Sequence, residues 1–169
     1  MTLGLFDNFP ANVPMLERFY STVPIEQLQR RLIQTFYEIN RREFSFEEAA
    51  YPTIPKCRII FEFGLADAES FNFIDEQEVK KAQNLLAKEH LETLDFFCAI
   101  RYYKGNAEEK RPLKFDYYLV RTLYKGDVFG IQVYHKKGLM YVSPEDLTLF
   151  IFNKVNDASK RKILKKTTA

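Results

Sequence analysis

The amino-acid sequence predicts an α+β fold in a single domain, with an antiparallel sheet built on a three-strand meander and helices packed mainly on one face. Three runs rich in aromatic and aliphatic residues, at 94–103, 113–124 and 128–135, have the composition of strands. Gly105-Asn106 follows the first run and Gly126-Asp127 the second, and such turn-forming pairs favour antiparallel hairpins. The meander is therefore the part of the chain on which the other elements are expected to pack.

Three segments carry the signals of helices. The segment 24–41 places its apolar residues at intervals of three and four, which predicts a surface helix with one buried stripe. Helices are also expected at 76–89 and 144–155, because Asp75 and Ser143 stand where an N-cap side chain belongs. With one further strand at 57–64, the predicted order of elements is roughly α-β-α-β-β-β-α.

The two ends of the chain differ from its centre. A chain of 169 residues has the size of one domain, which we expect to span 1–157. Residues 1–22 mix apolar side chains with turn formers and predict an irregular arm, with one helical turn around 15–20, packed on the domain or on a second subunit.

The C-terminal residues, 158–169, form a basic tail. The formal net charge is +2, but the segment from Lys154 onward holds six cations and one carboxylate, so it carries +5 and the remainder −3. A basic tail suits an acidic partner. Lysines that follow a helix also complement its dipole, which is the simpler explanation of the same charges.

The cysteines and the N-terminus predict a cytoplasmic protein. Cys57 and Cys98 lie in apolar, strand-like runs and match no metal-ligand spacing, so both are expected to be reduced core thiols. The first residues lack the cationic start and apolar segment of a signal peptide. The uninterrupted apolar runs are also far too short to span a bilayer, so we expect no membrane segment.

Alternation along the meander predicts an aromatic and cationic sheet face. If each run keeps a period of two, Phe115 and Leu119 face the core, while Asp116 and Thr122 fall on the other face. Open faces that mix rings with cations bind single-stranded nucleic acid, because rings stack on bases and cations hold phosphates. The candidate nucleic-acid-binding residues, on this face and in the tail, are Arg101, Tyr103, Lys114, Tyr118, Tyr134, Lys160, Arg161, Lys162, Lys165 and Lys166. The alternative is that a helix covers the face and the tyrosine hydroxyls reach its rim.

The sequence of these strands partly matches two known patterns, and neither match is complete. The RNA-recognition motif requires an aromatic residue and then an aliphatic one where this chain has Ile131 and Gln132. A metal-dependent nuclease core needs, besides a helix carboxylate and Asp116, a carboxylate and a lysine on the third strand, which holds Gln132-Val133-Tyr134. The second pattern therefore allows at most a degenerate nuclease-like core, which has the shape of the nuclease but not its activity.

No convergent set of catalytic groups is visible, so we expect a non-enzymatic binding or assembly protein without a cofactor or metal. The glycines form no phosphate loop or dinucleotide fingerprint. An acidic cluster is interpreted as a solvated face and a helix cap, and it comprises Glu62, Asp67, Glu69, Asp75, Glu76 and Glu78. Single-stranded nucleic acid is the expected partner. The alternatives are a subunit of a homo-oligomer or larger protein complex, and an enzyme whose residues are too scattered to recognise.

Overall fold

The computed structural model describes residues 3–51, 54, 56–89, 91–104 and 112–167. Within them, eight strands form one antiparallel sheet in the order β2-β3-β5-β6-β7-β1-β8, with β4 also paired to β3. The strands are β1 (Glu17–Ser21), β2 (Glu43–Ser45), β3 (Cys57–Asp67), β4 (Ser70–Phe73), β5 (Thr93–Lys104), β6 (Pro112–Lys125), β7 (Val128–Lys137) and β8 (Leu164–Lys166). The helices are α1 (Ile25–Ile39), the 3-10 turn η1 (Phe46–Glu48), α2 (Glu76–Lys88) and α3 (Pro144–Asp157).

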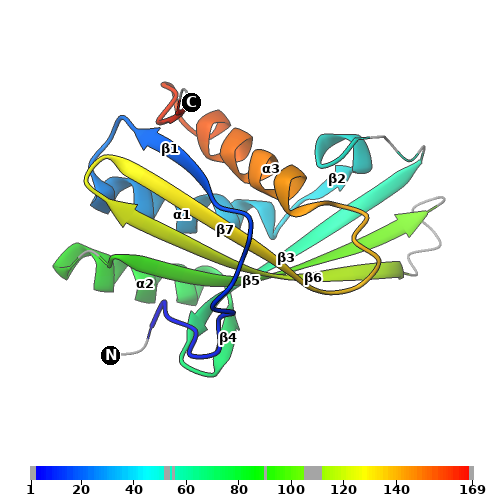
Figure 1. Ribbon diagram of the computed structural model, residues 1–169, viewed down its shortest axis with the longest axis horizontal. Helices are drawn as coiled ribbons and strands as arrows, with labels where there is room; N and C mark the ends of the chain where they lie inside the picture. Colours follow the sequence, from blue (N-terminus) through cyan, green and yellow to red (C-terminus); the bar gives the residue numbers. More distant parts are fainter. Residues whose placement is uncertain (1–2, 52–53, 55, 90, 105–111, 168–169) are drawn as a thin grey trace.

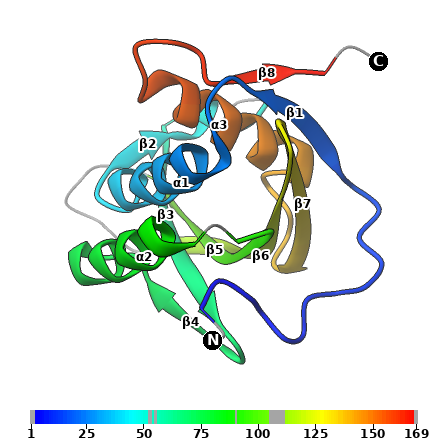
Figure 2. The same cartoon turned by 90° about the vertical axis from the view of Figure 1, so that its left-hand side faces the viewer.

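The predicted α+β fold with helices on one face of an antiparallel sheet is confirmed (Figure 1). The sheet curls around α1 and α3, with α2 beside α1, and we call this covered side the inner face (Figure 2). The N-terminal arm, residues 3–16, runs along the opposite, outer face before it enters β1. The predicted meander is β5-β6-β7; its break at Gly105-Asn106 lies outside the described residues.

The inner face of the sheet packs against the helices through a large aromatic core. The rings of Phe36 on α1 and Phe63 on β3 stack with centroids 4.0 Å apart, and Phe150 on α3 stacks on Phe61 at 4.5 Å. Both cysteines belong to this core and are unpaired, and burial raises the pKa of the Cys98 thiol well above its usual range. Each fully buried large side chain contributes about 1.5–3 kcal/mol, so this face accounts for most of the driving force for folding.

The helix starts follow the local chemistry that predicted them. The Asp75 carboxylate accepts a hydrogen bond from the backbone N–H of Glu78 at 2.8 Å, and the Ser143 hydroxyl accepts one from Asp146 at 3.0 Å. Both side chains satisfy first-turn N–H groups that have no partner within the helix. Helix α1 begins at Ile25, one residue after the predicted start, and Pro24 stands at its N-cap.

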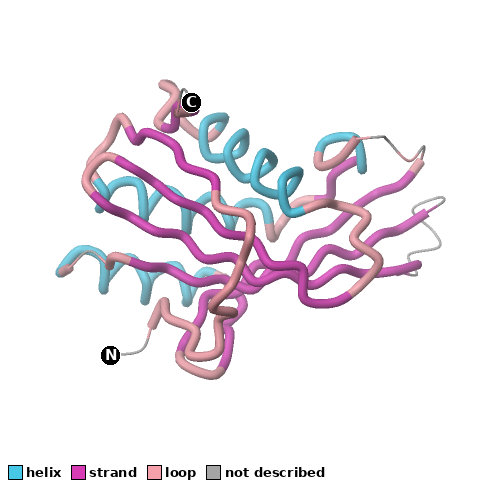
Figure 3. The backbone as a smooth tube through the Cα atoms, in the orientation of Figure 1, coloured by secondary structure: helices cyan, strands magenta, loops and turns pink. Residues whose placement is uncertain are grey.

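Several short strands differ from the sequence prediction. Part of the arm forms strand β1 instead of a helical turn. Strand β2 and η1 lie within 42–56, where no element was predicted, and β4 lies in the segment before α2 (Figure 3). The tail also folds back, since Leu164–Lys166 is β8 and the side chains of Ile163 and Leu164 are buried. Strands of three to five residues have no measurable period, so only their pairing with a longer neighbour reveals them.

Within the described part of the chain, no helix has both the length and the apolar character that crossing a membrane requires.

Candidate functional site

Strand β6 faces the opposite way from the sequence prediction. Its register pairs Tyr118 with Cys98 and Asp116 with Ile100, so both side chains lie on the inner face beside the core of β5. Tyr118 is 0% exposed, whereas Phe115, which was expected in the core, is 37% exposed on the outer face. The assignment of Tyr118 to an open aromatic face was therefore wrong, as was the placement of Asp116 and Thr122 there.

Polar groups of β6 lie in the core because other segments supply their hydrogen-bond partners. The Tyr118 hydroxyl donates to the backbone carbonyl of Val142, and the Thr122 hydroxyl donates to the carbonyl of Leu94 at 2.8 Å. A buried hydroxyl with a partner costs little, whereas one without a partner costs roughly 1–3 kcal/mol. These partners are 24 and 28 residues away in the sequence, so alternation alone could not reveal them.

Asp116 is the centre of the most polar part of the inner face. One carboxylate oxygen accepts from the backbone N–H of Met140 at 2.7 Å and lies 2.9 Å from Nε2 of His135. The other accepts from the Tyr102 hydroxyl at 2.7 Å and from the N–H of Tyr141 at 3.0 Å. Both oxygens are thus occupied, and the carboxylate holds the loop 138–142 against the sheet.

A glycine allows the loop 138–142 to approach the Asp116 carboxylate closely. Gly138 has a φ of 113°, and a Cβ at this position would collide with the Asp116 carboxylate, so the loop closes directly over it. Burial raises the pKa values of Tyr102 and Tyr118 well above the usual tyrosine range, which keeps both hydroxyls protonated as donors. The carboxylate, the imidazole and the two phenols that converge here therefore hold the loop on the sheet, and we assign them a structural role.

The outer face carries a half-exposed aromatic group that we call the ring surface. Its residues, from β5, β6 and β7, are Arg101, Tyr103, Phe115, Tyr117 and Tyr134. The rings of Phe115 and Tyr117 stack with centroids 4.8 Å apart, and Tyr117 contacts Phe97 at 5.3 Å. Tyr134 is 38% exposed.

Four exposed lysines lie where three strands share one end, and they fall on both sides of the sheet. Lys136 and Lys137 end β7, where Lys137 pairs with Tyr117 of the ring surface. Lys104 ends β5 and Lys114 lies near the start of β6, and both line a hollow on the inner side together with Tyr102 and Tyr141. Within the described part of the chain, no carboxylate lies within ion-pair distance of these four, which we call the lysine rim. Arg101 differs, because Nε lies 3.0 Å from the Glu62 carboxylate, and this hydrogen bond raises its pKa.

The N-terminal arm covers the neighbouring part of the outer face. Phe6 packs on Leu119, and the guanidinium of Arg121 lies 4.3 Å from the ring centroid of Phe9. Arg121 also forms two hydrogen bonds of 2.8 Å with the buried carboxylate of Asp95, which accepts a third from the N–H of Phe6. The described arm is therefore fixed on its own domain, and it leaves the ring surface open beside it.

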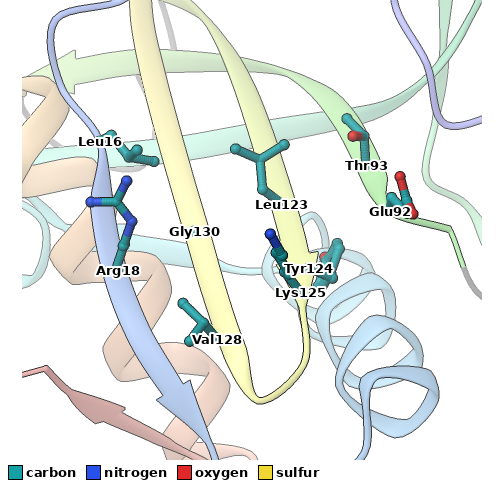
Figure 4. A pocket seen from close by; sticks show the side chains of 9 residues that line it. All are labelled: Leu16, Arg18, Glu92, Thr93, Leu123, Tyr124, Lys125, Val128 and Gly130. Atoms are coloured by element: carbon teal, nitrogen blue, oxygen red, sulfur yellow. The ribbon is translucent and has the colours of Figure 1, made fainter.

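A hollow of about 660 Å³ opens on the outer face at the other end of β6 and β7. Figure 4 shows it between β1, on which Arg18 lies, and the start of β5. Leu16 and Leu123 flank Gly130, which has no side chain to fill the floor: a Cβ there would lie 3.4 Å and 3.5 Å from them. The hollow was not predicted, since its floor depends on a glycine between two distant leucines.

The structure brings together only part of the predicted nucleic-acid site. Arg101, Tyr103 and Tyr134 share the outer face, whereas Lys114 pairs with Tyr102 and lies on the inner side, with its ammonium group 5.5 Å from the ring centroid of Tyr141. The tail is at the opposite end of β7, because β8 pairs with β1, and β1 pairs with the start of β7. The tail residues that lie away from the ring surface are Lys160, Arg161, Lys162, Lys165 and Lys166. The sequence prediction missed two rings, Phe115 and Tyr117, and three lysines, Lys104, Lys136 and Lys137. The correct phase of β6 would have identified the two rings.

Among the described residues, no three or more His, Cys, Asp or Glu side chains are grouped so that they could hold a metal ion. The carboxylates of the acidic cluster serve other purposes, such as the ion pair of Glu62 and the cap of Asp75. Comparison of the chain with protein families, with curated proteins and with solved structures found no match.

Proposed function

We propose that this protein is a non-enzymatic binding protein that holds single-stranded nucleic acid on the ring surface. One observation carries the proposal: half-exposed rings lie on a part of the sheet that neither helix nor arm covers, next to Lys136 and Lys137, which have no carboxylate partner among the described residues. Rings and cations at one end of an open sheet are the two components that strand binding requires.

The two components have different roles. Phe115, Tyr117 and Tyr134 offer apolar ring surface for bases, and base stacking is tolerant of sequence because every base has an aromatic face. Lys136 and Lys137 extend from the end of β7 beside Tyr117, where they reach phosphates. The tail is not part of this surface, although it adds positive charge to the molecule as a whole.

Fluorescence anisotropy with a labelled single-stranded oligonucleotide, at about 50 and 200 mM salt, tests the proposal. Phe115→Ala and Tyr134→Ala should each weaken binding by about 1–3 kcal/mol without changing the salt dependence, because stacking releases no counterions. Replacing Lys136 and Lys137 by glutamine should instead make the slope of log affinity against log salt less steep by about 1.4, since two phosphate contacts are lost and each contributes about 0.7 on a single strand.

Two matched variants serve as controls. Tyr118→Phe removes a hydroxyl on the inner face and should leave the affinity unchanged. Exchange of Lys160 and Lys162 for glutamine removes the same charge as the Lys136 and Lys137 variant, at the opposite end of the sheet, and should have the smaller effect. Absence of binding by the unmodified protein even at the lower salt concentration would exclude the proposal.

A protein partner is the second candidate for the same surface. The Arg101–Glu62 ion pair at its centre is neutral, and tyrosine with arginine is the composition typical of protein interfaces. Self-association is the simplest form, and sedimentation at micromolar concentration measures it directly. A dimer that Phe115→Ser and Tyr134→Ser convert to monomer would favour this candidate, whereas a monomer of unmodified protein would exclude self-association.

A further inference from the structure

The hollow on the outer face combines an aliphatic floor with a cationic margin. Leu16, Leu123 and Val128 supply its apolar groups, and Gly130 opens the space between them (Figure 4). A volume of about 660 Å³ lies within the range of small-molecule sites, roughly 300–1,000 Å³. The space is thus large enough for a ligand with a substantial apolar body.

The charged residues at the margin of the hollow determine which polar group such a ligand should carry. Arg18 on β1 and Lys125 at the end of β6 line the hollow, and both side chains are exposed. Within the described residues, neither has a carboxylate at ion-pair distance. The one acidic lining residue, Glu92, lies with Thr93 at the start of β5, across β6 and β7 from Arg18 (Figure 4). Arg18 on β1 and Lys125 on β6 lie on either side of β7 (Figure 4), so an anionic group is favoured between these two cations.

The floor favours a chain over a flat ring. The one aromatic lining residue, Tyr124, is 5% exposed, and its ring packs at 5.4 Å from Phe129 in the core. The hollow consequently lacks the exposed ring that base stacking uses, in contrast to the ring surface at the other end of the sheet. Leucine and valine side chains pack well against methylene groups, whose burial from water is favourable.

From this complementarity we propose that the hollow binds a free fatty carboxylate, with its chain on Leu16, Leu123 and Val128 and its carboxylate between Arg18 and Lys125. The site is separate from the ring surface and does not depend on nucleic-acid binding. The arm residue Leu16 forms part of the wall, so the ligand contacts both the arm and the sheet.

Titration with decanoate, and with decanol as its uncharged counterpart, tests the inference by calorimetry and by the methyl NMR signals of Leu16, Leu123 and Val128. Decanoate should bind at one saturable site, shift these signals and bind more tightly than decanol. Arg18→Gln and Lys125→Gln should each weaken decanoate binding by roughly two- to fivefold and leave decanol unaffected, as expected for exposed charges. Lys165→Gln, which removes an exposed cation outside the hollow, should change neither.

Gly130→Val provides the steric test, because its methyl groups would occupy the floor. It should abolish binding of both probes, provided that thermal unfolding shows an intact fold. Equal affinity for decanoate and decanol, an unchanged affinity in the Arg18 and Lys125 variants, or no saturable binding of decanoate to the unmodified protein would each overturn the inference. The Arg18 and Lys125 variants keep the test decisive if Gly130→Val does not fold, since both residues are exposed.

Discussion

Asp95 and Asp116 are both 0% exposed and lie on neighbouring strands, yet they are neutralised in different ways. Asp95, on the outer face, has a permanent cationic partner in Arg121, which binds both of its oxygens. Asp116, on the inner face, depends on a phenol, two backbone N–H groups and His135. Each carboxylate holds an irregular segment on the sheet, the arm in one case and the loop 138–142 in the other.

The comparison shows how one sheet attaches two segments that have no regular structure of their own. On the outer face the attachment is an ion pair with an arginine. On the inner face the donors include a phenol and two backbone N–H groups, which are compatible with the aromatic core around them. The two attachments should therefore respond differently to pH and to substitution.

Alkaline pH should affect the inner network most strongly. Burial raises the pKa values of Tyr102, Tyr118 and Tyr124 above the ordinary 10.0, so the folded protein keeps protons that the unfolded chain releases. Their contribution to stability is complete below pH 10 and is lost as the pH rises further. Each tyrosine should lower the free energy of unfolding by about 1.4 kcal/mol per pH unit, roughly 4 kcal/mol together.

Urea unfolding between pH 9 and pH 11 measures this loss. In the variant Tyr124→Phe the decrease should be smaller by about 1.4 kcal/mol per pH unit above pH 10, because one linked proton is removed. An identical pH dependence in this variant and in the unmodified protein would show that the buried tyrosines are not its cause.

Arg121→Ala should produce the largest loss among single substitutions. It leaves the Asp95 carboxylate buried without its cation, which typically costs about 3–5 kcal/mol. Arg101→Ala is the matched control: it removes an arginine from a partly exposed ion pair on the same face and should cost at most about 1 kcal/mol. Denaturant unfolding at neutral pH compares them, and similar losses in both would mean that burial of Asp95 does not set the energy of its pair.

Asp116→Asn should have a smaller and more local effect. An amide offers one acceptor oxygen in place of two, so some donors lose their partner at a cost of about 1–3 kcal/mol. The backbone amides of Met140 and Tyr141 should exchange hydrogen faster, while the core of β5 stays protected. Asp127→Asn in the exposed β6–β7 hairpin is the control; unchanged exchange at Met140 and Tyr141 in Asp116→Asn would show that other contacts hold the loop.

The sequence contains enough information for the main elements, because their signals are local. Capping residues and helical spacing identified the three long helices, and the composition of 57–64 identified β3, whose alternation puts Cys57, Ile59, Phe61 and Phe63 on the buried face. These predictions depend on neighbours within a few residues. Membership of a known family did not contribute, since none was recognised.

The candidate site could be predicted only in part, because β6 is apolar on both faces. Phe115, Leu119 and Leu123 point outward, and Tyr118 and Val120 point inward, so the pattern permits either phase. The true phase follows from the partners of the inward polar groups and from the arm that covers Leu119, neither of which is local in sequence. For this reason the predicted aromatic face differs by one residue along β6 from the ring surface in the structure.

Strand β1 brings together segments of the chain that are synthesised at very different times. It lies between β7 and β8, and the backbone N–H of Thr22 donates to the carbonyl of Ile163. Strand β1 thus receives one of its neighbours from a segment that is synthesised much later, since Thr22 and Ile163 are 141 residues apart in the sequence. The sheet cannot be completed until that segment has left the ribosome, and pairings over such long sequence separations form slowly. Until then the aromatic residues of the first strand and arm lack their final partners, which is the interval in which this protein is most exposed to aggregation.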